Sequence, residues 1–239
     1  MRSRSKSYGQ FCHVAKASQI LGERWTLLLV RELLLGSTRF SELQRALPKA
    51  SPTILTKRLK DLEFAGVVER NQTRGRQYAE YRLSVSGQEL GTLIDAMGTW
   101  AARWAMGRLQ KEELDEYFLI LDVSRRIRRD AIPSGTATVG FRFRPGHGDP
   151  DWWIVIDPVK AEICDADPGF ALDLLVSGSL RTITEVWLGH KAMNKEIADG
   201  HIRITGQPRL ERSCAQWLGF SAYAKVGSTP FSRTVGLKD

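Results

Sequence analysis

Two short amphipathic segments separated by Pro48 constrain the fold of this chain more than any other feature. In the first segment, Ser41 and Gln44 have the spacing of a capping box, in which the Ser hydroxyl and the Gln side chain each bond to a backbone amide. The pattern predicts a helix that starts at Ser41. Pro48 ends it, because the residue before a proline is disfavoured in the helical conformation.

The second segment repeats the helix-start signal. Ser51 is a good N-cap, and Pro52 at the first helical position lacks only an amide that has no helical partner. The spacing predicts a helix from Pro52 to about Ala65, ended by Gly66. The connection between the two helices is a few residues long, which is typical of a helix-turn-helix.

The second predicted helix has two distinct faces when successive residues are rotated by about 100°. The apolar stripe, which we expect to face the core, holds Leu55, Leu59 and Leu62. The opposite stripe carries small hydroxyls and long cations: Thr53, Thr56, Lys57 and Lys60. Such side chains suit a recognition helix, since they can reach base edges and phosphates. An ordinary solvated helix surface has the same appearance.

A predicted β-hairpin follows directly. Val67 to Val68 and Tyr81 to Leu83 form two extended runs around a turn-like segment, residues 71–77. Cations lie at and near its tip: Arg70, Arg74 and Arg76. A hairpin placed after a recognition helix forms the wing of a winged helix, where arginines meet phosphates or a narrow minor groove.

Helical periodicity also surrounds this region. Residues 12–35 predict either two helices separated at Gly22 or one helix bent there, and Ser84 or Ser86 caps a later helix with a wide apolar side. The apolar positions of that later helix are Leu90, Leu93, Ile94, Met97, Trp100, Ala101 and Trp104. They predict either core packing or a dimer surface formed together with the first helix, and we favour the dimer because two half-sites double the DNA contacts.

The charge distribution agrees with a nucleic-acid partner. Residues 1–110 hold 18 Lys and Arg against 9 Asp and Glu, whereas residues 111–239 hold 17 against 18. The basic excess therefore belongs to the first part of the chain. Such an excess is the electrostatic footprint of a DNA binder, although anionic membranes also attract basic domains.

Four segments of the chain carry a family resemblance: GERWTLLLVREL, RFSEL, SPTILTKRLKDLEFAGVVER and YRLSVSG. Over roughly residues 11–106 the chain resembles the HxlR-type winged helix-turn-helix regulators. The resemblance implies a dimeric bacterial transcription factor. This chain differs from the family pattern at two places: His13 stands where a Pro is usual, and no Pro precedes the returning strand of the wing. The predicted DNA-binding residues are Ser51, Thr53, Thr56, Lys57, Lys60, Arg74 and Arg76.

Cys12 has two interpretations. Some relatives use a cysteine here as a redox or electrophile sensor, and His13, Lys16 or a helix N-terminus could lower a thiol pKa. The alternative, which we favour, is a small apolar residue at the dimer interface. The three cysteines are far apart without CxxC spacing, so a disulfide framework or structural zinc site is not indicated.

The pattern in the second half of the chain predicts an α+β domain. Residues 111–130 have helical spacing, and four runs then read as strands: ATVGFRF, DWWIVID, VKAEIC and FALDLLVS. Short breaks between them predict an antiparallel sheet. SLRTITEVWLG and NKEIADG read as helices, HIRITG as a returning strand and RLERSCAQWLGF as a closing helix. We expect the helices to cover one face of the sheet.

This order, with WLG and ADGHIRITG, resembles a sterol-carrier-protein-like domain over about residues 112–222. The resemblance implies an apolar tunnel for a lipid or another hydrophobic small molecule. The predicted pocket residues are Phe141, Phe143, Trp153, Val155, Leu172, Leu174, Ile183 and Trp187. The alternative is that they form a solid core.

No catalytic arrangement, cofactor motif or metal-ligand spacing is recognised. His147, His190 and His201 are not spaced as ligands, and there is no phosphate-binding loop of the GxxxxGK type. No apolar run reaches the roughly 18 residues of a membrane span, and the N-terminus has no export signal. We therefore expect a cytoplasmic protein that is not an enzyme.

The sequence thus predicts three regions: residues 1–110 for DNA binding and dimerisation, residues 111–225 for ligand binding, and residues 226–239 as a flexible tail. The tail could also be a docked strand, although its Gly, Ser and Pro content favours disorder. The predicted function is a homodimeric regulator of transcription that binds double-stranded DNA and responds to an apolar small molecule. The alternative is a lipid carrier or scaffold whose winged helix binds protein.

Overall fold

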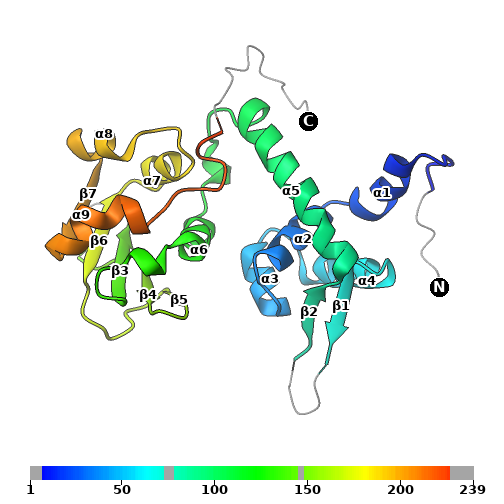
Figure 1. Ribbon diagram of the computed structural model, residues 1–239, viewed down its shortest axis with the longest axis horizontal. Coiled ribbons are helices and arrows are strands. Elements are labelled where there is room, and N and C mark those ends of the chain that lie inside the picture. Colours follow the sequence, from blue (N-terminus) through cyan, green and yellow to red (C-terminus); the bar gives the residue numbers. More distant parts are fainter. Residues whose placement is uncertain (1–6, 73–77, 145–147, 227–239) are drawn as a thin grey trace. The chain divides into compact units, whose positions relative to one another are not determined.

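The computed structural model describes residues 7–72, 78–144 and 148–226. The chain forms two compact units, Met1–Gly98 and Thr99–Asp239, and the division falls within one long helix (Figure 1). The domain boundary predicted at residue 110 follows the end of that helix by a few residues. The predicted tail, from residue 227 onward, lies outside the described residues.

The first unit is mostly helical and carries one hairpin (Figure 1). Its elements, in chain order, are α1 (His13–Leu21), α2 (Thr26–Leu34), α3 (Phe40–Ala46), α4 (Pro52–Phe64), β1 (Val68–Asn71), β2 (Glu80–Leu83) and α5 (Val85–Trp104). The strands pair antiparallel, from Val68 opposite Leu83 to Asn71 opposite Glu80. The predicted helix-turn-helix and wing are therefore confirmed, and of the two alternatives at Gly22 the chain forms separate helices.

The start of α4 follows the predicted chemistry. The Ser51 hydroxyl accepts a hydrogen bond from the amide of Ile54 at 3.3 Å, and Pro52 occupies the first helical position. Gly66, just past the helix, has φ +72°, a conformation that glycine adopts without steric cost. Leu55, Leu59 and Leu62 are buried, as their stripe predicted.

The predicted start of α3 is wrong by two positions. Arg39 rather than Ser41 occupies the N-cap, and the carboxylate of Glu42 accepts the amides of Thr38 at 2.8 Å and Arg39 at 3.0 Å. A carboxylate that accepts two amides makes charge-assisted bonds stronger than a hydroxyl cap. The segment is also held from outside, because the amide of Tyr81 bonds to the carbonyl of Thr38.

The core of this unit lies between the helices and the base of the wing. It consists of buried apolar residues from α2 to β1: Leu29, Val30, Leu33, Leu43, Leu47, Ala50, Leu55, Leu59, Leu62, Val67 and Val68. Leu90 and Ile94 of α5 pack against this cluster. The core therefore fixes α4 by one face and leaves its opposite face outside.

The second unit combines a five-stranded sheet with helices (Figure 1). Its strands are β3 (Ala137–Arg142), β4 (Trp152–Ile156), β5 (Ala161–Cys164), β6 (Leu174–Gly178) and β7 (Ile202–Gly206). Its α-helices are α6 (Glu116–Arg126), α7 (Leu180–Trp187), α8 (Met193–Ala198) and α9 (Pro208–Trp217). Two single 3₁₀ turns flank α6, at Lys111–Glu113 and Arg129–Ala131.

The sheet is mixed, which corrects the predicted antiparallel arrangement. The strand order is β5-β4-β3-β6-β7, and β3 pairs parallel with β6 while the other pairs are antiparallel. Residues 165–173 carry the chain from the β5 edge across to the free side of β3. Asp173 anchors the crossing, because its carboxylate accepts the Thr138 amide at 2.7 Å and its own amide bonds to the Thr138 carbonyl.

One face of this sheet builds a core with the helices. Ala137, Val139 and Phe141 of β3 belong to the same buried cluster as residues of α6, α7 and α9. Two buried tryptophans of the helices have partners: the Trp187 indole of α7 donates to Asp122 of α6 at 2.7 Å, and the Trp217 indole donates to the Leu210 carbonyl within α9 at 3.3 Å. Satisfied indole N–H groups allow these large rings to be buried.

The helix predicted over residues 111–130 is shorter than expected. Asp115 caps α6 by accepting the Phe118 amide at 2.8 Å, and the helix ends at Arg126 because the Arg128 amide bonds to the Trp217 carbonyl instead. Among the described helices, none is both long enough and apolar enough to cross a lipid bilayer.

Candidate nucleic-acid interface

The face of α4 opposite the core is polar and exposed. It carries the predicted reading residues Thr53, Thr56, Lys57 and Lys60, all of which are exposed to solvent. Ser51, also exposed, precedes them as the helix cap. Leu55 and Leu59 anchor the other side of the helix in the core. The helix therefore presents two hydroxyls in its N-terminal half and two cations beside them.

The cations of α4 divide into two kinds. Within the described residues, Lys57 and Lys60 have no ion-pair partner. Arg58 instead binds Asp61 at 2.8 Å and Glu23 at 2.7 Å, and only 12% of its side chain is exposed. Arg58 thus ties α4 to the residues before α2. The two lysines keep uncompensated charges that are available to an anionic partner.

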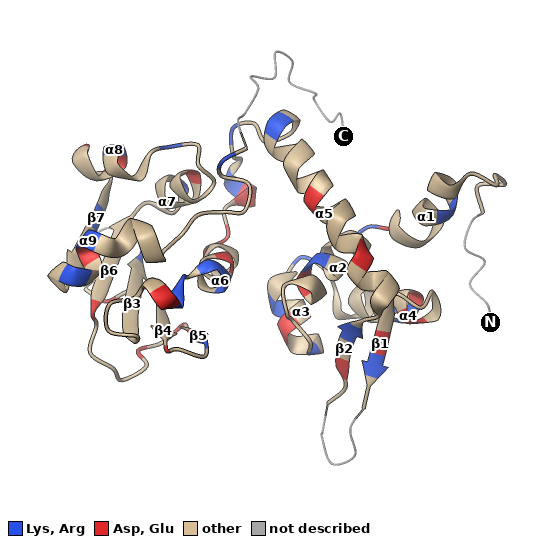
Figure 2. Ribbon diagram, in the orientation of Figure 1, with Lys and Arg blue, Asp and Glu red and all other residues tan. Residues whose placement is uncertain are grey.

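The wing adds basic residues to this unit. Arg70 of β1 is exposed and lies opposite Tyr81 in the hairpin register, and Arg82 of β2 pairs with Glu80 at 3.1 Å. Figure 2 shows basic segments on both strands. Arg74 and Arg76, the predicted phosphate contacts at the wing tip, lie outside the described residues. Arg70 therefore carries the basic character of the described part of the wing.

An apolar row runs along α5. Leu93, Met97, Trp100 and Trp104 are all exposed, with Trp100 60% accessible, and they recur at spacings of four and three residues. Near α1, Phe11 and Val14 are also exposed, Phe11 at 98%. Side chains of this size are normally covered, so the row marks a surface that a partner can bury.

The cysteines differ in environment. Cys12 is exposed and stands immediately before α1, where its carbonyl accepts the Lys16 amide at 3.0 Å. Cys214 of α9 is buried in the second core, and burial raises the pKa of its thiol to about 12. Burial also raises the pKa of Cys164. Cys12 is thus exposed, Cys164 half-buried and Cys214 buried, so a reagent reaches Cys12 most directly among the three.

The sheet divides the predicted pocket residues between its two faces. Five lie in the core cluster between sheet and helices: Phe141, Phe143, Leu174, Ile183 and Trp187. The other three lie on the opposite face of the sheet. Trp153 and Val155 pair with Gly140 and Thr138, which point away from the core, and Leu172 packs over Gly140 on that face. The eight residues therefore do not line one common cavity.

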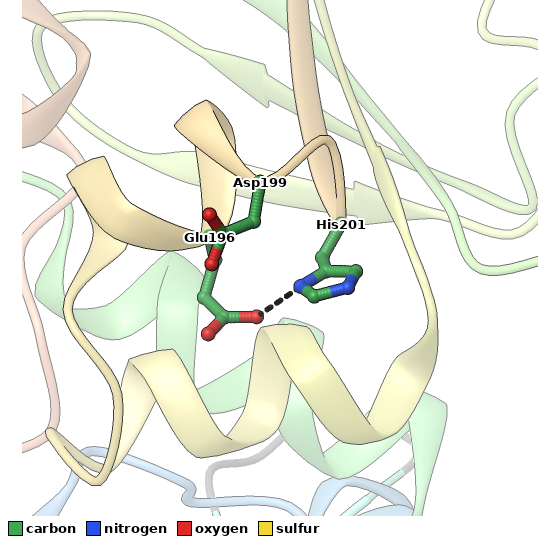
Figure 3. A group of neighbouring side chains, drawn as sticks. All are labelled: Glu196, Asp199 and His201. Carbon is green, nitrogen blue, oxygen red and sulfur yellow. Dashed lines mark hydrogen bonds and ion pairs between the residues drawn. The ribbon is translucent and has the colours of Figure 1, made fainter.

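A cluster that was not predicted from the sequence lies at the turn between α8 and β7. Glu196, Asp199 and His201 place one ligand atom each within 4.8 Å of one another (Figure 3). His201 Nδ1 lies 3.0 Å from the buried carboxylate of Glu196, and Lys191 Nζ lies 3.4 Å from the same oxygen. The same ammonium lies 3.1 Å from Glu185, so Lys191 is shared between two carboxylates and the arrangement is an ion-pair network. The Glu-x-x-Asp-x-His spacing was its signal in the sequence.

Comparison with known proteins extends this description. A family model described as HxlR-like helix-turn-helix matches residues 20–108. The HTH-type transcriptional regulator YvaP of Bacillus subtilis is 44% identical over 92 residues, which cover 37% of this chain and 83% of YvaP. The regulator sll1512 of Synechocystis sp. is 32% identical over 97 residues, covering 40% of this chain and 72% of that protein.

A solved structure is also similar. The reduced form of the transcriptional regulator YodB from B. subtilis is 32% identical, covers 38% of this chain and 92% of its own, and has a TM-score of 0.34.

A helix-turn-helix followed by a β-wing defines a winged-helix protein, the class in which a surface helix reads DNA. With the match to YvaP, the particular family follows: this chain belongs to the HxlR-like helix-turn-helix family of transcriptional regulators. The family and these relatives are regulators of transcription, not enzymes.

Proposed function

We propose that the protein is a cytoplasmic homodimer that binds double-stranded DNA with α4 in the major groove. The observation that carries the proposal is the exposed face of α4, where Thr53 and Thr56 lie beside Lys57 and Lys60, which have no ion-pair partner among the residues that the structure describes. Short hydroxyl side chains allow a helix to approach base edges closely. Lysines on the same face then meet phosphates on either side of the groove.

The wing extends the proposed interface. Arg70 lies on the strand that leads to the wing tip, and Arg74 and Arg76 follow it in sequence. Arginine suits both phosphate contacts and insertion into a narrow minor groove. We assign Arg70, Arg74 and Arg76 to these contacts, and they contribute affinity rather than direct reading of base sequence.

The dimer is proposed from the apolar row of α5. Leu93, Met97, Trp100 and Trp104 follow the four-three spacing at which two helices pack side by side. Aromatic residues and Met are enriched in the cores of protein interfaces. A second copy of the chain would cover the row, with Phe11 and Val14 adding apolar area near α1.

The proposal includes an apolar small molecule bound by the second unit. Five of the eight predicted residues share the core between sheet and helices, so a ligand there would have to part these layers. Such a ligand changes DNA affinity only if it prefers one dimer geometry over another. Titration with N-phenyl-1-naphthylamine tests this: saturable fluorescence without any change in DNA affinity would refute the regulatory role.

The DNA-binding proposal is tested by competition. Purified full-length protein is titrated into labelled DNA from upstream of its own gene, against scrambled competitor. We expect specific binding, and we expect Lys57→Ala/Lys60→Ala to weaken it by at least about tenfold, because each phosphate contact carries part of the affinity.

The matched control is Lys195→Ala/Lys225→Ala, which removes the same charge from exposed positions in the second unit. Equal weakening by both double variants would show that net charge, not the α4 face, controls binding. No preference for any genomic fragment at low salt would favour the carrier or scaffold, in which the winged helix binds protein.

A further inference from the structure

A row of polar residues crosses three adjacent strands of the second unit. In the sheet register, Arg142 of β3 lies beside Ser177 of β6, and Ser177 lies beside Arg203 of β7. Phe141 and Ile202, their chain neighbours, are buried in the core. Because successive side chains of a strand point to opposite faces, the Arg-Ser-Arg row lies on the face away from that core.

The row borders a hollow of about 360 Å³. The residues that line it are Arg142, Arg144, Ser177, Gly178, Ser179, Gly200, His201 and Arg203. Among these described residues there is no acidic side chain, whereas three are arginines. The volume is within the range of small-molecule sites, which begins at about 300 Å³.

Two of the three arginines carry charge that no carboxylate balances in the described part of the chain. Arg142 donates to backbone carbonyls, from Nε to Asp149 O at 3.4 Å and from a terminal nitrogen to Gly148 O. These partners are neutral, so they orient the guanidinium without cancelling its charge. The Arg203 side chain has no hydrogen bond or ion pair within the described residues.

Arg144 differs from the other two. It is paired with Glu116 at 3.4 Å and with Asp151 at 3.6 Å, so its charge is already balanced. His201 is likewise committed to Glu196. The Ser177 hydroxyl donates to the Arg203 carbonyl at 3.2 Å and forms the floor between the two free cations. The uncompensated charge of the hollow thus resides on Arg142 and Arg203.

We propose that this hollow binds a small oxyanion, a carboxylate or a phosphate, between the guanidinium groups of Arg142 and Arg203. The two arginines stand two strands apart, roughly 10 Å across the sheet, so an anion over Ser177 lies within reach of both side chains. A guanidinium offers a planar fork that matches a carboxylate or phosphate with two hydrogen bonds. The site shares no residue with the proposed DNA interface or with the apolar core.

A phosphate of DNA has the same chemistry as a small phosphate ligand. We favour the small ligand, because the residues from three strands enclose a hollow of the size of a small-molecule site. Binding of a DNA phosphate by the same arginines is therefore the competing outcome of the test.

Isothermal titration of the full-length protein tests the site with two probes, inorganic phosphate and succinate, at constant ionic strength made up with chloride. We expect saturable binding of at least one probe, and the pair distinguishes phosphate from carboxylate recognition. Arg203→Ala should weaken that binding by at least about tenfold, the effect of losing a charged hydrogen-bond partner. Arg203→Lys keeps the positive charge but loses the planar fork, so its affinity for the probe should lie between those of the wild type and Arg203→Ala.

Arg209→Ala is the control, since Arg209 is an exposed arginine of α9 that does not line the hollow. If Arg203→Ala bound the probe with wild-type affinity, the proposal would be overturned. Equal losses of probe affinity in Arg203→Ala and Arg209→Ala would overturn it as well. Absence of saturable binding with either probe would also overturn it. An Arg203→Ala variant that loses DNA affinity instead would assign the row to a nucleic-acid backbone.

Discussion

Two side chains hold the starts of the helices that form the helix-turn-helix. Ser51 caps α4 through the Ile54 amide, and Glu42 caps α3 by accepting the Thr38 and Arg39 amides. Ser41, whose spacing suggested a cap, lies inside α3. A serine can cap only where the backbone leaves the helical conformation, and that place depends on contacts the local sequence does not contain.

Replacing these capping residues should separate their roles. Ser51→Ala and Glu42→Ala should each lower the free energy of unfolding by about 1 kcal/mol, since each leaves helix-start amides unsatisfied. Ser41→Ala should change it by less than about 0.5 kcal/mol. Urea unfolding measures all three, and Ser51→Asp, which keeps an acceptor, should restore stability. A large loss in Ser41→Ala would contradict the assignment of the α3 cap.

The buried thiol allows a second prediction at this scale. Burial raises the pKa of Cys214 to about 12 and also excludes reagents, so the thiolate that attacks a disulfide reagent is scarce at pH 8. Cys214→Ala should leave the number of thiols titrated by Ellman's reagent in the native protein unchanged. It should lower the number in guanidinium chloride by one. A lower native count would mean that α9 opens readily.

At the scale of elements, Gly87 and Gly91 of α5 lie in different surroundings. A side chain at Gly87 would collide with the Val67 carbonyl and crowd Leu83, whereas at Gly91 the nearest atom, Leu34 Cδ2, is 3.6 Å away. Gly87 therefore permits the close approach of α5 to the start of the wing. Gly91 has no such role and only weakens the helix.

The two substitutions should have opposite signs. Gly87→Ala should destabilise the protein by about 1 to 3 kcal/mol, because the clash is with backbone. Gly91→Ala should stabilise it by up to about 1 kcal/mol through helix propensity. Thermal or urea unfolding distinguishes them, and destabilisation of similar size in both variants would indicate that the packing of α5 is not as described.

Elements defined by local signals could be predicted from the sequence, and those defined by distant contacts could not. Ser51, Pro52 and Gly66 delimit α4 within one short stretch, so its bounds and its buried leucines were foreseen. The parallel pairing of β3 with β6 depends on where residues 165–173 cross, which no local pattern records.

The candidate sites also differ in whether local sequence or distant contacts determine them. The α4 face needs only helical periodicity, whereas the apolar pocket needed the sheet register, which put Phe141 and Trp153 on opposite faces. The register likewise brings Arg142, Ser177 and Arg203 together from three strands. No spacing in the sequence shows that row.

At the scale of the whole molecule, the proposed dimer can be tested with a substitution that should disrupt it. Trp100→Glu places a charge in the centre of the apolar row of α5, and it should weaken self-association by at least about tenfold, the effect of losing a central interface aromatic. Light scattering across a concentration series measures the change. Val159→Glu, at another exposed apolar position in the second unit, should leave the dimer intact. A monomeric wild-type protein would contradict the dimer.

The salt dependence of DNA binding tests the central claim most directly. The logarithm of the association constant is measured against the logarithm of salt concentration for the wild type and Lys57→Ala/Lys60→Ala. If both lysines contact phosphates, the variant's slope should be shallower by about two, because each contact releases close to one counterion. An unchanged slope would mean that the α4 face does not lie on the DNA backbone, and it would contradict the proposed reading role.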